Sequence, residues 1–228
     1  MVFIAKIYKN PDVTKNILLL GMFYLDLIAK LLQNKELPGS EAHAGMMPKG
    51  RSLTMFAKEE PVVHSAVLLL LFNEGDSTRI IFIKRAEYEG IHSGQIAFPG
   101  GRAEPEDANF WQTAVRETME ETGIKQPVTY LGHLSDLYVP LSGYLIHPFV
   151  GYIAERPVYE PDIHEVSEVF DEDLAWFGNT NAKGVFRYKS GILPGVAPCF
   201  YSNQHIIWGA TAMIFNEFLI LLRNNGDL

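Results

Sequence analysis

The alternation of hydrophobic and polar positions predicts a mixed α/β fold. Residues 62–72 are a nearly continuous apolar run, and residues 79–84 are again mostly apolar after a short turn of polar residues and glycine. Two such runs predict a hairpin in a buried sheet. Strand-like segments recur at 128–134 and 145–153, after a helical pattern at 107–122. Strands and helices that alternate in this way are typical of a mixed sheet between helices.

Both ends of the chain carry helical patterns. Residues 16–32 have amphipathic spacing, and residues 204–222 predict a strand followed by a long apolar helix. Residues 41–52 are rich in Gly, Ala, Met and Lys and are interpreted as a connection. We therefore expect an N-terminal helical extension and connection at 1–55 and one domain at 56–228.

Composition and charge argue against two classes of binding partner, polynucleotides and membranes. The chain has 228 residues, of which 47% are hydrophobic, and a formal net charge of −8. The negative charge argues against a polynucleotide partner, because phosphate backbones are bound through an excess of Lys and Arg. No apolar stretch approaches the roughly 20 residues that span a bilayer, so we expect no membrane partner. A small-molecule nucleotide stays compatible with the composition, and a homodimer is left open.

The single cysteine and the N-terminal residues give information on the cellular location of the protein. One cysteine, Cys199, excludes an intramolecular disulfide framework and predicts a cytoplasmic location. Its apolar neighbours predict an inert core thiol. The apolar run at 17–25 faintly resembles a secretory signal, but Asp26 interrupts it and no small-residue cleavage site follows. Met22 is a candidate for the physiological start, because the residues before it show no clear pattern.

Candidate chemistry lies on the predicted helix at 107–122. Glu117, Glu120 and Glu121 stand at i, i+3 and i+4, so they share one helix face. Three carboxylates this close oppose one another's ionisation unless a cation lies among them. Oxygen ligands without nearby His or Cys favour Mg²⁺ or Mn²⁺. The alternative interpretation is a solvated acidic face on an ordinary helix.

The same helix is expected to pack on the core through its other face, leaving the glutamates outward. That face carries residues at helical spacing, Trp111, Val115, Thr118 and Thr122. Asp107 is interpreted as the N-cap of the helix, accepting backbone N–H groups at its positive end.

Residues 101–124 resemble the Nudix box, G-x5-E-x7-R-E-U-x-E-E-x-G-U, through Gly101, Arg116, the three glutamates and Gly123. The interval from Gly101 to Arg116 is one residue longer than in the general box, and Asp107 lies near the position of its first glutamate. The resemblance implies a Nudix-like α/β/α sandwich and a metal-dependent pyrophosphatase. It implies metal binding by Glu117, Glu120, Glu121 and Gly101, and catalytic roles for Glu120 and Arg116.

The segment before the box is similar to the motif of the coenzyme A pyrophosphatase branch, in which the longer box is also usual. It runs from Ile81 through Arg85 to the glycine pair at 100–101, and it has Gly90 where the branch has an arginine. Ala42-His43-Ala44 and Trp208-Gly209 also resemble segments of this branch. The resemblance implies substrate contacts from a set of residues in and after the strand, namely Lys84, Arg85, His92, Gly94, Gln95 and Phe98.

This branch hydrolyses the pyrophosphate of coenzyme A or acyl-CoA, giving adenosine 3′,5′-bisphosphate and 4′-phosphopantetheine or its acyl form. A glutamate outside the box often binds metal or takes a proton from the attacking water in Nudix enzymes. Glu168 is the first candidate for that role and Glu165 the second, against the alternative that both are solvated loop acids. Two other functions stay open, namely hydrolysis of another nucleoside diphosphate derivative and non-catalytic nucleotide sensing. The intact box glutamates argue against the second of these.

Overall fold

The predicted hairpin forms the centre of a mixed sheet. The structure is a computed structural model that describes residues 24–33, 36–49, 62–87, 93–190 and 193–224. β1 (Val63–Glu74) pairs antiparallel with β2 (Ser77–Arg85) and parallel with β7 (Tyr144–Tyr152). The eight-stranded sheet has the central order β3-β2-β1-β7-β5, with β4 paired to β1, β6 to β7 and β8 to β2.

Five further strands complete this sheet. They are β3 (Ile96–Ala97), β4 (Gly100–Arg102), β5 (Thr129–His133), β6 (Leu137–Val139) and β8 (Val166–Asp173).

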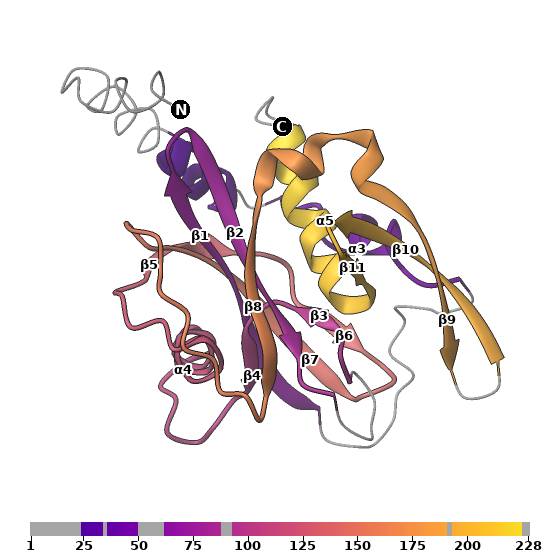
Figure 1. Ribbon diagram of the computed structural model, residues 1–228, viewed down its shortest axis with the longest axis horizontal. Coiled ribbons are helices and arrows are strands. Elements are labelled where there is room, and N and C mark those ends of the chain that lie inside the picture. The colour runs from indigo at the N-terminus through magenta and orange to yellow at the C-terminus, as the bar shows by residue number, and fades with distance from the viewer. Residues whose placement is uncertain (1–23, 34–35, 50–61, 88–92, 191–192, 225–228) are drawn as a thin grey trace.

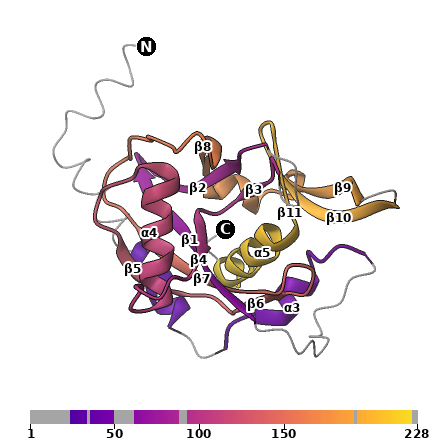
Figure 2. The ribbon, with the colours of Figure 1, turned by 90° about the horizontal axis from the view of Figure 1, so that it is seen from below.

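The two faces of β1 pack against helices on opposite sides of the sheet. Side chains alternate across a strand. Ala66, Leu68 and the other even-numbered apolar residues pack with α4 (Phe110–Thr122), whereas Leu69 and Leu71 belong to the core that includes α5 (Gly209–Arg223). Figure 2 shows α4 and α5 on either side of the sheet. The predicted α/β/α sandwich with a mixed sheet is confirmed.

A second, smaller sheet was missed at the sequence level. β9 (Lys183–Ser190), β10 (Leu193–Ser202) and β11 (His205–Trp208) form an antiparallel sheet next to α5 (Figure 1). Two 3₁₀ helices, η1 (Leu174–Gly178) and η2 (Thr180–Ala182), lead from β8 into it. Only the strand before the last helix was predicted. Cys199 lies buried in β10, as expected, and burial raises the pKa of its thiol.

Two local predictions are corrected. Asp107 is not the N-cap of α4, because the helix begins at Phe110 and the Asn109 side chain accepts a hydrogen bond from the Gln112 backbone N–H. Residues 41–52 are not wholly a connection, because α3 (Gly39–Ala44) is helical there.

The segment that precedes the sheet packs into the main core. Residues 24–32 are helical, as the amphipathic pattern predicted, and Leu25, Ile28 and Leu32 are buried with the α5 side of the sheet. The part of that pattern before residue 24, including Met22, lies outside the described residues. The proposed division at residue 55 stays a prediction. Within the described residues, no helix has the length and apolar character that crossing a membrane requires.

A buried carboxylate joins α3, α5 and the loop after β5. Glu217 on α5 is fully buried and lies 2.9 Å from His43 Nε2. It also accepts hydrogen bonds from the backbone N–H groups of Gly39 and Ser135. Burial alone would raise the pKa of Glu217, but the hydrogen bonds from His43 and Ser135 hold it below its ordinary value. One side chain thus connects three segments that are far apart in the sequence.

Glu217→Gln is expected to lower the free energy of unfolding by about 2 to 3 kcal/mol, because charge-assisted hydrogen bonds to a buried carboxylate are lost. For a chain of this size that is a fall of about 5 to 10 °C in Tm. Because the folded-state pKa is depressed, the stabilisation is complete above the ordinary value of 4.5 and is lost as the pH falls through the folded-state pKa. Thermal unfolding at pH 7 and pH 4 tests this, with the exposed Glu41→Gln on α3 as control.

Candidate active site

A glycine pair brings β4 against the acidic face of α4. Gly100 has φ 150°, and a Cβ there would collide with the carbonyl oxygen of Ala66 in β1. Its N–H donates a 2.8 Å hydrogen bond to Glu121 Oε2. A Cβ on Gly101 would collide with the carboxylate of Glu117. Both glycines are therefore required for the strand to approach these two glutamates.

Glu121 is buried, contrary to the expectation that all three glutamates point outward. It is 2% exposed, and burial raises its pKa to about 8 against the opposing effects of the Gly100 N–H and Arg85. Arg85 Nη1 lies 3.8 Å from Glu121 Oε1. Burial also raises the pKa of Glu117, although Arg116 opposes the shift. The inner part of the acidic face thus holds carboxylates whose charge is poorly compensated by the protein.

Arg116 organises the outer part of that face. Its guanidinium donates to Glu117 Oε1 and to Glu120 Oε2, each at 3.0 Å, and its Nη2 donates to the Arg102 carbonyl at 3.1 Å. Two further bonds, of 3.0 and 2.9 Å, join it to both oxygens of Asp107. The hydrogen bond between them lowers the pKa of Asp107 and raises that of Arg116.

Asp107 is therefore an anchor for Arg116. The sequence indicated an acidic residue at this position of the box, but not its partner.

The donor set fits a hard divalent cation. Among the described residues, no group of three or more His, Cys, Asp or Glu side chains stands arranged as a metal site, and Arg116 bonds Glu120 and one oxygen of Glu117. The charge of Glu117 nevertheless raises the cost of ionising Glu121, the charge of Glu120 raises the cost of ionising Glu117, and Glu165 adds to both. A cation between these carboxylates would relieve that repulsion, and oxygen ligands suit Mg²⁺ or Mn²⁺.

The two glutamates outside the box have different surroundings. Glu165 lies just before β8, and its charge acts on both Glu117 and Glu121. Glu168 lies within β8, opposite Lys84, and its Oε2 is 3.1 Å from His205 Nε2. The second candidate from the sequence thus interacts with the acidic face, whereas the first is engaged by the smaller sheet.

The predicted substrate residues divide into three groups. Arg85 ends β2, and its Nε is buried without a hydrogen-bond partner among the described residues. Its backbone N–H donates to the Gln95 carbonyl, and the Gly94 N–H donates to Ala86, so the loop closes beside this arginine. Phe98 is instead 2% exposed and packs against Phe82 in the core. Its ring contributes to core packing, and a substrate contact from Phe98 stays a prediction. His92 and Gly90 lie outside the described residues.

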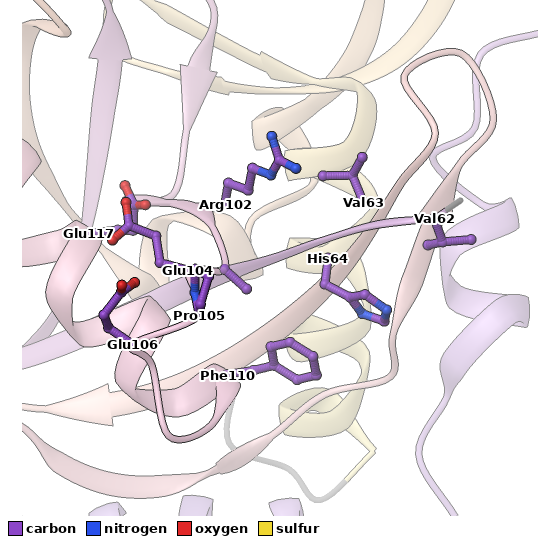
Figure 3. A pocket seen from close by; sticks show the side chains of 10 residues that line it. Val62, Val63, His64, Arg102, Glu104, Pro105, Glu106, Phe110 and Glu117 are labelled. Carbon is purple, nitrogen blue, oxygen red and sulfur yellow. The ribbon is translucent and has the colours of Figure 1, made fainter. Parts of the chain in front are cut away.

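An open pocket of about 870 Å³ adjoins Glu117. Figure 3 shows His64 and Phe110 on one side of it and the acidic side chains Glu104, Glu106 and Glu117 on the other. Arg102 also lines it. Sequence reasoning missed this pocket because its lining comes from β1, from the loop after β4 and from α4.

Comparisons with known proteins agree with this geometry. A model of the NUDIX domain matches residues 62–186. The mouse mitochondrial coenzyme A diphosphatase NUDT8 is 28% identical over 169 residues, which cover 72% of this chain and 80% of the mouse protein. The Nudix hydrolase NudL of Yersinia pestis is 37% identical over 161 residues, covering 67% of this chain and 76% of NudL.

A solved structure shares the fold. The MutT/nudix family protein of Enterococcus faecalis matches with a TM-score of 0.51 and 14% identity, covering 75% of this chain and 66% of that chain. The chain belongs to the Nudix family and is a Nudix pyrophosphohydrolase. Enzymes of this family generally use divalent metal ions.

Gly101→Ala is expected to leave a folded protein whose turnover falls about tenfold or more, because the new methyl group displaces the Glu117 carboxylate and misplaced reacting groups are costly. Gly100→Ala is expected to destabilise the fold instead, since its Cβ meets backbone that cannot move aside. Circular dichroism and steady-state kinetics distinguish the two. Wild-type turnover in Gly101→Ala would contradict the importance of the close approach.

Proposed function

We propose that this chain hydrolyses the pyrophosphate bond of coenzyme A or an acyl-CoA, giving adenosine 3′,5′-bisphosphate and 4′-phosphopantetheine or its acyl form. The observation that carries the proposal is the segment from Arg85 to Gly101, which resembles the coenzyme A branch and ends against the acidic face of α4. The similarity to a mouse protein described as a coenzyme A diphosphatase supports it. The cytoplasmic location inferred from the single cysteine belongs to the same proposal.

Glu117, Glu120, Glu121 and Gly101 are the proposed metal-binding residues, with Mg²⁺ or Mn²⁺ as the ion. Such an ion, when bound, polarises the phosphoryl oxygens and makes bound water a better nucleophile. The side chains that support this assignment are Glu121, buried against the Gly100 N–H, and Arg116, which holds Glu117 and Glu120 in position.

Glu165 is the better candidate for the proton acceptor. Glu168 Oε2 lies 3.1 Å from His205 Nε2, so its carboxylate already has a hydrogen-bond partner in the smaller sheet. Glu165 instead interacts electrostatically with the two inner carboxylates of the acidic face, where an attacking water would need to lie. A general base must come within hydrogen-bond reach of the proton it takes, directly or through one water.

Arg85 is the proposed phosphate contact. Its unpaired, buried Nε and its position 3.8 Å from Glu121 support a role beside the metal site, where a guanidinium can bind two phosphate oxygens at once. Lys84, Gly94 and Gln95 belong to the same strand end and loop and complete the proposed binding set.

Glu165→Gln is expected to lower kcat by about 10²-fold, since general base catalysis typically contributes that much or more. The matched control is Glu168→Gln, which is expected to keep kcat within about threefold while losing only the contact with His205. Steady-state kinetics of both variants at saturating Mg²⁺ decide between the residues. The reverse order of the two losses would assign the role to Glu168.

Purified wild-type protein with Mg²⁺ or Mn²⁺ is expected to cleave coenzyme A at least about tenfold better than 3′-dephospho-coenzyme A. A charge-assisted contact to the 3′-phosphate contributes about 1.5 to 3 kcal/mol, or about 10- to 150-fold in affinity. Mass spectrometry of the products identifies the bond that is cleaved. The substrate panel includes NADH, ADP-ribose, diadenosine polyphosphates and nucleoside triphosphates.

Equal rates on the two coenzyme A forms would mean that the 3′-phosphate is not recognised, as the glycine at position 90 would allow. Faster cleavage of NADH or ADP-ribose than of either would assign the enzyme to another nucleoside diphosphate derivative.

A further inference from the structure

A chain of three polar side chains leads into the pocket beside Glu117. His147 Nδ1 lies 2.9 Å from Asp136 Oδ1, and His147 Nε2 lies 2.9 Å from His64 Nδ1. His147 is buried in β7, and the Phe110 ring stacks on it with a centroid distance of 3.8 Å. His64 is exposed on β1 and lines the pocket (Figure 3).

The order of donors along this chain follows from the carboxylate. Asp136, when ionised, can only accept a hydrogen bond, so His147 carries its proton on Nδ1. In a neutral His147 ring, Nε2 is then an acceptor, and His64 must donate to it from Nδ1. A neutral His64 therefore keeps an unprotonated Nε2. The pocket thus contains a hydrogen-bond acceptor, His64 Nε2. Asp136 sets the tautomer of His64 through His147, which lies between them.

The pocket's charge indicates which group it accepts. Glu104, Glu106 and Glu117 line it against one guanidinium, that of Arg102, so a further phosphate would meet a net negative surface. Val63 and Phe110 add apolar surface. An uncharged arm with aliphatic groups and amide or hydroxyl donors fits this combination better than a phosphate does. The pantetheine half of coenzyme A has that chemistry.

We propose that this pocket binds the pantetheine arm of the substrate, and that His64 Nε2 accepts a hydrogen bond from one of its amide or hydroxyl groups. His147 and Asp136 are positioning residues that hold His64 in the accepting tautomer. The proposal rests on the proposed function, because Glu117 at the edge of the pocket belongs to the proposed metal site. The pyrophosphate would then lie at α4, with the arm extending toward β1.

The test compares the two product halves as ligands of the full chain by isothermal titration calorimetry with Mg²⁺. His64→Phe keeps an aromatic ring beside Phe110 and removes the acceptor. It is expected to weaken binding of 4′-phosphopantetheine about fivefold to tenfold, the effect of one hydrogen bond, and to leave adenosine 3′,5′-bisphosphate unchanged. The control is His133→Phe on β5, an exposed histidine outside the pocket lining, which is expected to change neither.

The positioning role has its own readout. Long-range ¹H–¹⁵N NMR spectra are expected to show His64 protonated on Nδ1 in the wild type. Asp136→Asn can present an N–H group to His147 and reverse the order of donors, so the proton of His64 is expected to move to Nε2. The KM for coenzyme A should then rise by a similar factor with little change in kcat. An unchanged tautomer and KM would overturn the role of Asp136.

Cleavage of coenzyme A by the wild type is measured separately, so the two proposals can fail independently. Wild-type cleavage with unaltered 4′-phosphopantetheine binding in His64→Phe would overturn the pocket assignment and leave the proposed function standing. Absent cleavage with the expected loss of 4′-phosphopantetheine binding would overturn the function and support the pocket. Selective weakening of adenosine 3′,5′-bisphosphate would place the nucleoside half in the pocket and overturn the inference.

Discussion

The hydrogen bond from the Gly100 N–H to the buried Glu121 carboxylate is the contact on which the site depends. It forms because β4 runs close beside both β1 and α4, an approach that leaves no room for a Cβ at Gly100 or Gly101. A carboxylate in such a position is costly to ionise, and its pKa rises to about 8. The fold places this carboxyl group near those of Glu117 and Glu165. Such a cluster of acidic groups favours binding of the divalent cation that we propose.

A second buried carboxylate, that of Glu217, stabilises the packing on the other side of the sheet. Glu217 ties the helix α3 and the Ser135 backbone to α5, and Asp136 follows Ser135 directly. The same residue therefore supports the loop from which Asp136 reaches His147. In contrast to Glu121, Glu217 receives enough hydrogen bonds to overcome the cost of burial, and its pKa falls. The two glutamates differ in the number of donors that their surroundings supply.

Local patterns in the sequence were sufficient for the central hairpin, the acidic helix and its three glutamates. They could not predict that Glu121 is buried, because its burial depends on a strand 21 residues earlier. The partner of His43 is 174 residues away, and the smaller sheet has exposed positions such as Val185 and Tyr201 that break the expected alternation. Asp107 was predicted to cap the backbone of the helix, but it bonds the Arg116 side chain. These two residues are nine positions apart, and they meet because the loop before α4 folds back onto the helix.

Arg116 determines how the negative charge is divided on α4. Its contacts compensate the charge of Asp107, of Glu120 and of one oxygen of Glu117, and the side chain of Glu120 remains 56% exposed. Among the residues that the structure describes, Arg85, at 3.8 Å, is the cationic side chain that pairs with Glu121. The Arg116 guanidinium thus stabilises the helix, whereas within the described part of the chain the Glu121 carboxyl group still lacks a cation close enough to offset its burial. In the proposed site, Glu117 would help to hold the ion while its Oε1 bonds Arg116, and Asp107 keeps that arginine in place.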